Sequence, residues 1–196
     1  RLSVVAWAQS GCHCLFHNGL TGRHAVQGGI QAEAFDGKST VGRDEFFPGK
    51  GFGSLKDYGV NYKQVELVDD TPDLEGMAAA AADPNVKVVL IQRSKGYSTR
   101  ASLSVDEIGE MVRVIKAANP NAAIIVDNCY GEFTQTQEPC QVGADIAVGS
   151  LIKNPGGGIA PTGGYIVGRK DLVELCAYRL NAPGLGKELG CTLETP

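Results

Sequence analysis

Two short apolar runs that each lead into a reactive side chain constrain the fold of this chain more than any other feature. Residues 124–126 are followed by Asp127, and residues 146–148 lead into the segment 149–158, where Lys153 precedes a series of glycines. Continuous apolar runs of this length are typical of strands buried inside a parallel sheet. Functional residues of open parallel sheets gather at the C-terminal ends of the strands. The pattern therefore predicts one site that contains Asp127 and Lys153.

The chemistry of this pair suits an enzyme that holds pyridoxal 5′-phosphate (PLP). A lysine amine forms a Schiff base with the cofactor aldehyde, and an aspartate keeps the pyridine nitrogen protonated, so that the ring can act as an electron sink. Ser150, two residues after the second apolar run, would offer its hydroxyl to the cofactor phosphate. Taken singly, Asp127 fits a turn residue and Lys153 a surface lysine, because most charged residues are exposed. Their order, spacing and strand context favour the site.

The surrounding pattern predicts strands that alternate with helices. Ser104 and Glu107 have the spacing of a capping box, and the apolar residues 108, 111, 112 and 115 form one helical stripe that would cover a sheet face. A strand, a helix and a second strand at this spacing form a right-handed parallel crossover. The other predicted elements are a strand at 60–67, a turn at 69–72, a helix at 74–82, strands at 86–91, 123–126, 144–148 and 163–168, and a helix that Asp171 caps and that ends near residue 180. Residues 2–8 fit either a strand or a buried helical turn.

The loop after the strand at 86–91 supplies candidate substrate-binding residues. Arg93, Ser94 and Tyr97 lie in this loop, at the edge of the predicted sheet that also carries Asp127. Arg93 fits three roles that the sequence does not separate: a ligand of the substrate carboxylate, a residue that positions the neighbours of the cofactor 3′-oxygen, and a solvated loop arginine. Tyr130 and Glu132 border the same site, and Tyr130 is a further substrate-binding candidate, for which a core role is as well supported as a catalytic one.

Four segments together resemble one bacterial family, the methionine gamma-lyase-like or aluminium resistance proteins, which are similar to cystathionine lyases. They are residues 91–97, 126–133, 149–158 and 160–165, within a match that runs from about residue 53 to about residue 193. The resemblance implies the aspartate aminotransferase type of PLP fold (fold type I), which is an α/β fold with a three-layer, mostly parallel sheet. It also implies PLP as the cofactor, a small amino-acid substrate, and a homodimer or homotetramer for the full-length protein.

The resemblance assigns roles to further residues. In this family a helix start holds the cofactor phosphate, and this chain matches it at Ser10, Gly11 and His13, with Cys12 in place of a threonine. Backbone N–H groups at a helix N-terminus bind phosphate whatever the side chains are. Cys129 lies where fold relatives place a small residue against the cofactor ring.

The resemblance also divides the chain into two segments. Residues 1–52 match poorly and would contribute the phosphate-binding start of the domain, whereas residues 53–196 would form the large PLP-binding domain. We expect that domain to be truncated at its C-terminus, because family members continue through a small domain that closes over the substrate. The match is lost between residues 15 and 52, and we expect a reading-frame or gene-model error there. Resequencing the locus and finding the same frame would contradict this expectation.

The function that the resemblance implies is a PLP-dependent carbon–sulfur lyase that acts on an amino acid by γ- or β-elimination. A PLP-dependent transferase or decarboxylase on the same fold is one alternative. An inactive fragment of the cofactor domain is another. The residues themselves identify neither the substrate nor a basis for aluminium resistance, and no motif suggests aluminium binding.

Composition and charge exclude other classes of partner. The chain has 196 residues, 43% of them hydrophobic and 20% charged, as expected for a globular domain with one substantial core. Its net charge of −4 gives no sign of the basic surface that nucleic-acid-binding proteins carry. With no apolar run of membrane-spanning length and no leader pattern, a cytoplasmic protein is expected. Cys12 and Cys14 lie beside two histidines but lack the second ligand pair of zinc sites, so no metal is predicted.

Overall fold

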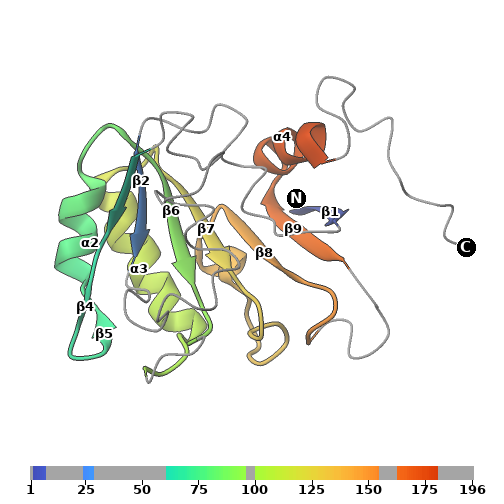
Figure 1. The fold of residues 1–196 in the computed structure, drawn as a ribbon, viewed down its shortest axis with the longest axis horizontal. Helices are drawn as coiled ribbons and strands as arrows, with labels where there is room; N and C mark the ends of the chain where they lie inside the picture. Colours follow the sequence, from blue (N-terminus) through green and yellow to red (C-terminus); the bar gives the residue numbers. More distant parts are fainter. Residues whose placement is uncertain (1, 8–23, 29–60, 96–99, 155–162, 181–196) are drawn as a thin grey trace, which may run out of the picture.

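The computed structural model describes residues 2–7, 24–28, 61–95, 100–154 and 163–180, and seven of its strands form one sheet (Figure 1). In spatial order these strands are β1 (Leu2–Trp7), β9 (Gly164–Arg169), β8 (Ile146–Ser150), β7 (Ala123–Asp127), β6 (Val86–Gln92), β2 (His24–Gly28) and β3 (Asn61–Gln64). A two-stranded hairpin, β4 (Leu67–Val68) and β5 (Thr71–Pro72), lies apart from this sheet.

Most of the sheet is parallel. β3, β2, β6, β7 and β8 run in one direction, and β9 runs antiparallel between β8 and β1. The register pairs Gln92 with Asp127 and Asp127 with Val148, so β6, β7 and β8 end at the same edge. The predicted α/β class with a mostly parallel sheet is confirmed, and so is the predicted convergence of these strand ends.

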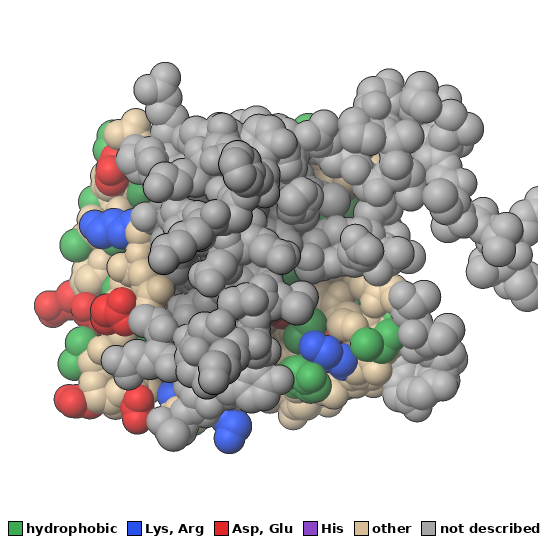
Figure 2. All heavy atoms as spheres, in the orientation of Figure 1, with side chains coloured by type: hydrophobic (Ala, Val, Ile, Leu, Met, Phe, Trp, Pro, Cys, Tyr) green, Lys and Arg blue, Asp and Glu red, His purple; other side chains and the backbone are tan. Residues whose placement is uncertain are grey.

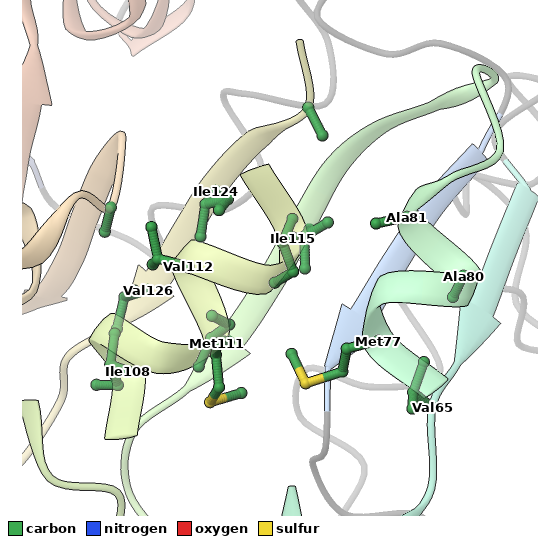
Figure 3. Packing of buried hydrophobic residues seen from close by; sticks show 14 of the residues in the cluster. Val65, Met77, Ala80, Ala81, Ile108, Met111, Val112, Ile115, Ile124 and Val126 are labelled. Atoms are coloured by element: carbon green, nitrogen blue, oxygen red, sulfur yellow. The ribbon is translucent and has the colours of Figure 1, made fainter. Parts of the chain in front are cut away.

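Two helices pack on one face of the sheet, α2 (Leu74–Ala81) and α3 (Val105–Ala118). The predicted capping box is present, because the Ser104 hydroxyl accepts the N–H of Glu107 and the Ser104 N–H donates to the Glu107 carboxylate. Figure 3 shows the stripe of α3 in the same buried cluster as Val126 of β7. Each fully buried side chain of this size contributes about 1.5–3 kcal/mol of hydrophobic stabilisation. The fully buried residues of the stripe are Ile108, Met111 and Ile115.

The opposite face of the sheet is also buried. Val88 and Leu90 of β6 and Ile125 of β7 alternate with the residues that face α3, and their exposed fractions are 1%, 9% and 1%. Strands buried on both faces read as continuous apolar runs, which is why the sequence pattern shows no alternation here. The third long helix of the described chain, α4 (Lys170–Leu180), contacts β9 and β1.

Some predicted boundaries are wrong. The strand expected at 60–67 is divided into β3, which ends at Gln64, and β4, which begins at Leu67. The turn expected at 69–72 is the hairpin turn between β4 and β5, in which Asp69 and Asp70 adopt φ values of 49° and 59°. Tight hairpins favour such left-handed pairs because their twist matches that of the strands.

The predicted cap of the last helix is also wrong. α4 begins at Lys170, so Asp171 lies inside the first turn. The Asp171 carboxylate instead accepts hydrogen bonds from the Arg169 guanidinium, at 2.6 Å and 3.2 Å. β1 settles the open prediction for residues 2–8 in favour of a strand, and β2 is a strand that the sequence pattern did not predict.

One edge of the molecule is acidic. The hairpin and the start of α2 expose Glu66, Asp69, Asp70 and Glu75, and Figure 2 shows red side chains along this edge. The edge lies at the opposite side of the sheet from β8 and β9 (Figure 1). A short 3₁₀ helix, η2 (Pro139–Val142), lies within the connection between β7 and β8 and packs against α3.

Candidate functional site

Asp127 is the last residue of β7 and lies half-buried at the edge where the parallel strands end. Its backbone carbonyl accepts the N–H of Arg93 at 2.9 Å, which ties the end of β6 to the end of β7. Its side-chain Oδ1 atom accepts the N–H of Cys129 at 3.0 Å. No described lysine or arginine forms an ion pair with this carboxylate. The negative charge of Asp127 is therefore available to a ligand.

Lys153 lies in the turn that follows β8, three residues after Ser150, whose carbonyl accepts the Lys153 N–H at 3.4 Å. The Nζ atom lies over the Tyr130 ring, 4.2 Å from its centroid, in a cation–π arrangement. Burial lowers the pKa of Lys153, but Cys129, Tyr130 and Asp127 raise it more, so that the pKa lies above its ordinary value. The Lys153 side chain is therefore an ammonium group at neutral pH and must lose a proton before its amine can attack an aldehyde.

Cys129 lies between these two groups in the chain and stays a neutral thiol. Burial, together with the Asp127 carboxylate, raises the pKa of Cys129 to about 12. Thiolate, not thiol, is the nucleophile and metal ligand. Cys129 therefore contributes size and polarity to the site but no charge and no nucleophile.

Arg93 is brought to the site's edge by β6, but its guanidinium is engaged by the protein. The residue is 3% exposed, and all five of its side-chain N–H groups have acceptors in the loops that follow β6 and β7. These acceptors are the Leu103 carbonyl and the side chains of Asn128, Glu138, Thr134 and Gln135, at distances of 2.8–3.5 Å. In this conformation Arg93 organises both loops. Binding of a substrate carboxylate by Arg93 remains a prediction that would require some of these bonds to be exchanged.

A cavity of about 380 Å³ opens at the Arg93 side of this edge. Its lining includes Arg93, Ser94 and Tyr130, so three of the predicted substrate-binding residues border the same space. Tyr130 connects the cavity to the lysine, because it lines the cavity and its ring also contacts Lys153. The remaining lining residues are Ser102, Leu103, Ser104, Gly131, Thr134 and Gln135.

Several predicted site residues lie outside the described part of the chain. These are the fourth substrate-binding candidate, Tyr97, and the whole predicted phosphate-binding start. The predicted members of that start are Ser10, Gly11, Cys12 and His13. The described site is thus the one formed by Asp127, Cys129, Ser150 and Lys153, with Tyr130 beside them.

A partly buried polar network that joins Asn128, Glu132 and Tyr165 was not predicted. The Tyr165 hydroxyl donates to Glu132 Oε1 at 2.8 Å and accepts from the Asn128 amide at 3.3 Å. A Cβ atom at Gly149 would collide with both the Glu132 carboxyl and the Tyr165 hydroxyl. The glycine in an otherwise apolar strand was the sequence signal for this close approach.

Comparisons with known proteins agree with this architecture. Residues 38–196 match the model of the family described as Methionine gamma-lyase. The uncharacterized protein YnbB of Bacillus subtilis (strain 168) is 52% identical over 145 residues, which are 74% of this chain and 34% of YnbB. A solved structure from Clostridium novyi NT, described as a carbon-sulfur lyase involved in aluminum resistance, is 39% identical with a TM-score of 0.81. The alignment covers 96% of this chain and 45% of that one.

A more distant solved structure shows that the fold is shared more widely. The pyridoxal-5′-phosphate-dependent protein YhfS of Escherichia coli is 14% identical and has a TM-score of 0.60, over 92% of this chain and 44% of YhfS. The fold is therefore that of the aspartate aminotransferase-like, PLP-dependent proteins. This chain spans less than half the length of these relatives.

In the described part of the chain, none of the helices has the length and apolar character needed to cross a membrane. The topology, the pair of charged residues at the strand ends and the family match over most of the sequence agree with one another. The chain belongs to the methionine gamma-lyase family.

Proposed function

We propose that this protein is a PLP-dependent lyase that cleaves a carbon–sulfur bond of a small amino acid by γ- or β-elimination. The observation that carries the proposal is the placement of Asp127 and Lys153 after adjacent parallel strands, at one edge of the sheet. The description of the Clostridium novyi relative as a carbon-sulfur lyase supports the reaction class.

The charges of the site fit this cofactor. Among the described residues, neither Asp127 nor Lys153 takes part in an ion pair. The Asp127 carboxylate, which has no cationic partner among these residues, suits a ligand that carries an N–H donor. The Lys153 amine suits a ligand that carries an aldehyde. The neutral Cys129 thiol adds no charge that would compete with either.

Each residue would have a separate task. When bound, PLP supplies an electron sink for the negative charge that develops on the substrate carbon. Asp127 would accept the pyridine N–H and keep the proton on that nitrogen, and Ser150 would donate to the phosphate together with residues 10–13. Lys153 would bind the aldehyde and then carry a proton at Nζ. Cys129 would lie against the ring.

Substrate recognition is proposed for the residues around the cavity. Arg93, Ser94 and Tyr130 border it, and Tyr97 belongs to the same loop as Ser94. Tyr130 lines the cavity and also contacts Lys153, which supports a substrate that reaches the lysine from this side. We assign the cofactor domain to residues 53–196, with β1 and β2 of the preceding segment completing its sheet.

The proposal extends to assembly and location. A homodimer or homotetramer in the full-length protein and a cytoplasmic location are the expectations that accompany this enzyme class. Two cysteines of the described chain support a reducing compartment, because Cys129 and Cys140 are free thiols.

Reduction of the bound cofactor tests the central assignment. The purified protein is mixed with PLP, its visible spectrum is recorded before and after borohydride, and the reduced adduct is located by peptide mapping. We expect a yellow species that becomes fixed on Lys153 and that is absent from Lys153→Ala. An adduct on another lysine, such as Lys170 or Lys187, would overturn the assignment.

Product analysis separates the lyase from the alternatives on the same fold. Elimination yields a keto acid and ammonia without any amino acceptor, whereas a transferase requires an acceptor and a decarboxylase releases carbon dioxide. Asp127→Ala is expected to retain some cofactor but to lose most of the turnover, because the electron sink depends on the protonated ring. Unchanged turnover in Asp127→Ala would refute that role.

A further inference from the structure

Glu132 is a buried acid to which the proposed reaction gives no role. It is 4% exposed, and it lies in the loop that follows β7, five residues after Asp127. Its two carboxyl oxygens differ: Oε1 accepts the Tyr165 hydroxyl at 2.8 Å, whereas Oε2 is buried without any hydrogen-bond partner. An ionised oxygen that is buried without a donor is strongly disfavoured.

The charged groups around Glu132 make its ionisation still less favourable. Asp127 at the end of β7 and Glu138 before η2 are both acids, and no described lysine or arginine forms an ion pair with Glu132. The Arg93 guanidinium of β6 is engaged elsewhere, and Lys153 lies over Tyr130. Burial raises the pKa of Glu132 above its ordinary value, and the two acids raise it further, against a lowering by the backbone N–H of Glu132 and by the Tyr165 hydrogen bond.

Glu132 also connects the ends of three strands. Its side chain receives the hydroxyl of Tyr165 from β9, and its backbone carbonyl receives the amide of Asn154 at 3.2 Å, from the residue next to Lys153. Its own loop is continuous with Asp127. Gly149 of β8 leaves the space in which the Glu132 carboxyl and the Tyr165 hydroxyl meet. The relative positions of Asp127 and Lys153 are thus set partly through this residue.

We propose that Glu132 is a positioning residue that acts in its protonated, uncharged form, holding the loop of Asp127 against the loop of Lys153 without adding a second negative charge to the site. An ionised Glu132 would favour the protonated form of Lys153 and so oppose the attack of its amine on an aldehyde. The purpose of this positioning, the reaction of Lys153 with PLP, rests on the proposed function. The protonation state of Glu132 is independent of it.

Infrared spectroscopy of the protein without cofactor tests the charge state directly. At neutral pH the wild-type protein should show the C=O stretch of a protonated carboxylic acid, and Glu132→Gln should lose that band. Glu110→Gln, at an exposed position of α3, serves as the control and should keep it. A spectrum in which Glu132→Gln removes only carboxylate absorption would show that Glu132 is ionised and would overturn the proposal.

The pH dependence of the Lys153 reaction with PLP tests the positioning role. Glu132→Gln preserves the shape and the neutral charge, so the midpoint pH at which borohydride traps the Lys153 adduct should stay within about 0.3 units of wild type. If Glu132 were ionised, removing its charge would lower that midpoint by about one unit or more. That shift would contradict the proposal.

Truncation supplies the complementary measurement. Glu132→Ala removes the contact with Tyr165 and so loosens the loop that carries Cys129. The Cys129 thiol should then react with an alkylating reagent about tenfold faster, which corresponds to a fall of about one unit in its pKa. Glu132→Gln should not. Equal Cys129 reactivity in Glu132→Ala and wild type would exclude the positioning role. Because alkylation and infrared absorption need no cofactor, failure of Lys153 to bind PLP would count against the proposed function alone.

Discussion

The Nζ atom of Lys153 lies 4.2 Å from the centroid of the Tyr130 ring, and Tyr130 itself has a left-handed backbone with φ of 68°. A non-glycine residue in this region is strained, and such strain concentrates at functional sites. Here the left-handed backbone belongs to the tyrosine whose ring lies under the lysine, while 60% of that residue remains exposed. The loop thus presents Lys153 to the edge of the sheet rather than burying it.

Replacement of Tyr130 should change the protonation of Lys153. A cation–π contact at such a site favours the ammonium by about 0.5–1 kcal/mol, so its loss in Tyr130→Ala should lower the pKa of Lys153 by about half a unit. The amine is then free at lower pH, and the midpoint for borohydride trapping with PLP should fall accordingly. Tyr130→Phe keeps the ring but loses the hydroxyl, whose hydrogen bond also raises the pKa of Lys153, so it should show a smaller fall than Tyr130→Ala. An equal fall in Tyr130→Phe would assign the effect to the phenol hydroxyl.

Arg93 should matter first for stability. Arg93→Lys cannot satisfy the five acceptors that the guanidinium serves in two loops, and breaking such a buried network costs about 2–5 kcal/mol. Urea unfolding measures this loss, and Arg113→Lys, at an exposed position of α3, should change stability little. A variant of Arg93 that unfolds like wild type but no longer binds substrate would instead favour the substrate-carboxylate role.

Alkylation of Cys129 should be slow at neutral pH and should keep rising into the alkaline range. With a pKa of about 12, its thiolate fraction grows about tenfold for each pH unit well above pH 9, whereas an ordinary cysteine near pKa 8.5 has already reached its plateau. Asp127→Asn removes a negative charge that raises this pKa, so it should speed alkylation at pH 8. Peptide mapping isolates the Cys129 signal. A plateau near pH 9 in the wild-type protein would contradict the argument.

The parts of the fold that local chemistry determines could be predicted from the sequence. The capping box at Ser104 and the stripe through Ile115 lie within one helix, so adjacent residues contain the necessary information. The strands that lead to Asp127 and to Ser150 were also predictable, because continuous apolar runs mark buried parallel strands. The parallel pairing of β7, which ends at Asp127, with the strands on either side then follows from the right-handed crossover rule and does not depend on particular side chains.

The parts that depend on long-range register could not be predicted. Arg93 occupied a predicted loop, but its acceptors lie 35–45 residues away at Asn128, Thr134, Gln135 and Glu138, except for the nearer Leu103 carbonyl. The approach of Tyr165 to Glu132 depends on the antiparallel pairing of β8 with β9, which sets Tyr165 opposite Gly149. β2 was missed because its five residues, HAVQG, carry neither a helical nor an alternating pattern.

Gly149 should therefore resist substitution by even one methyl group. The φ of Gly149 does not require glycine, so Gly149→Ala tests only whether there is room for a Cβ atom. The new Cβ would meet the Glu132 carboxyl and the Tyr165 hydroxyl, and such overpacking lowers the free energy of unfolding by about 1–3 kcal/mol. Tyr165→Ala removes one of the two colliding side chains, because both the hydroxyl and the ring carbon Cζ of Tyr165 crowd this position. The double variant should accordingly lose less unfolding free energy in urea than the sum of the single variants. Simple additivity would mean that the strand moves instead, and that Tyr165 and Glu132 do not depend on this glycine.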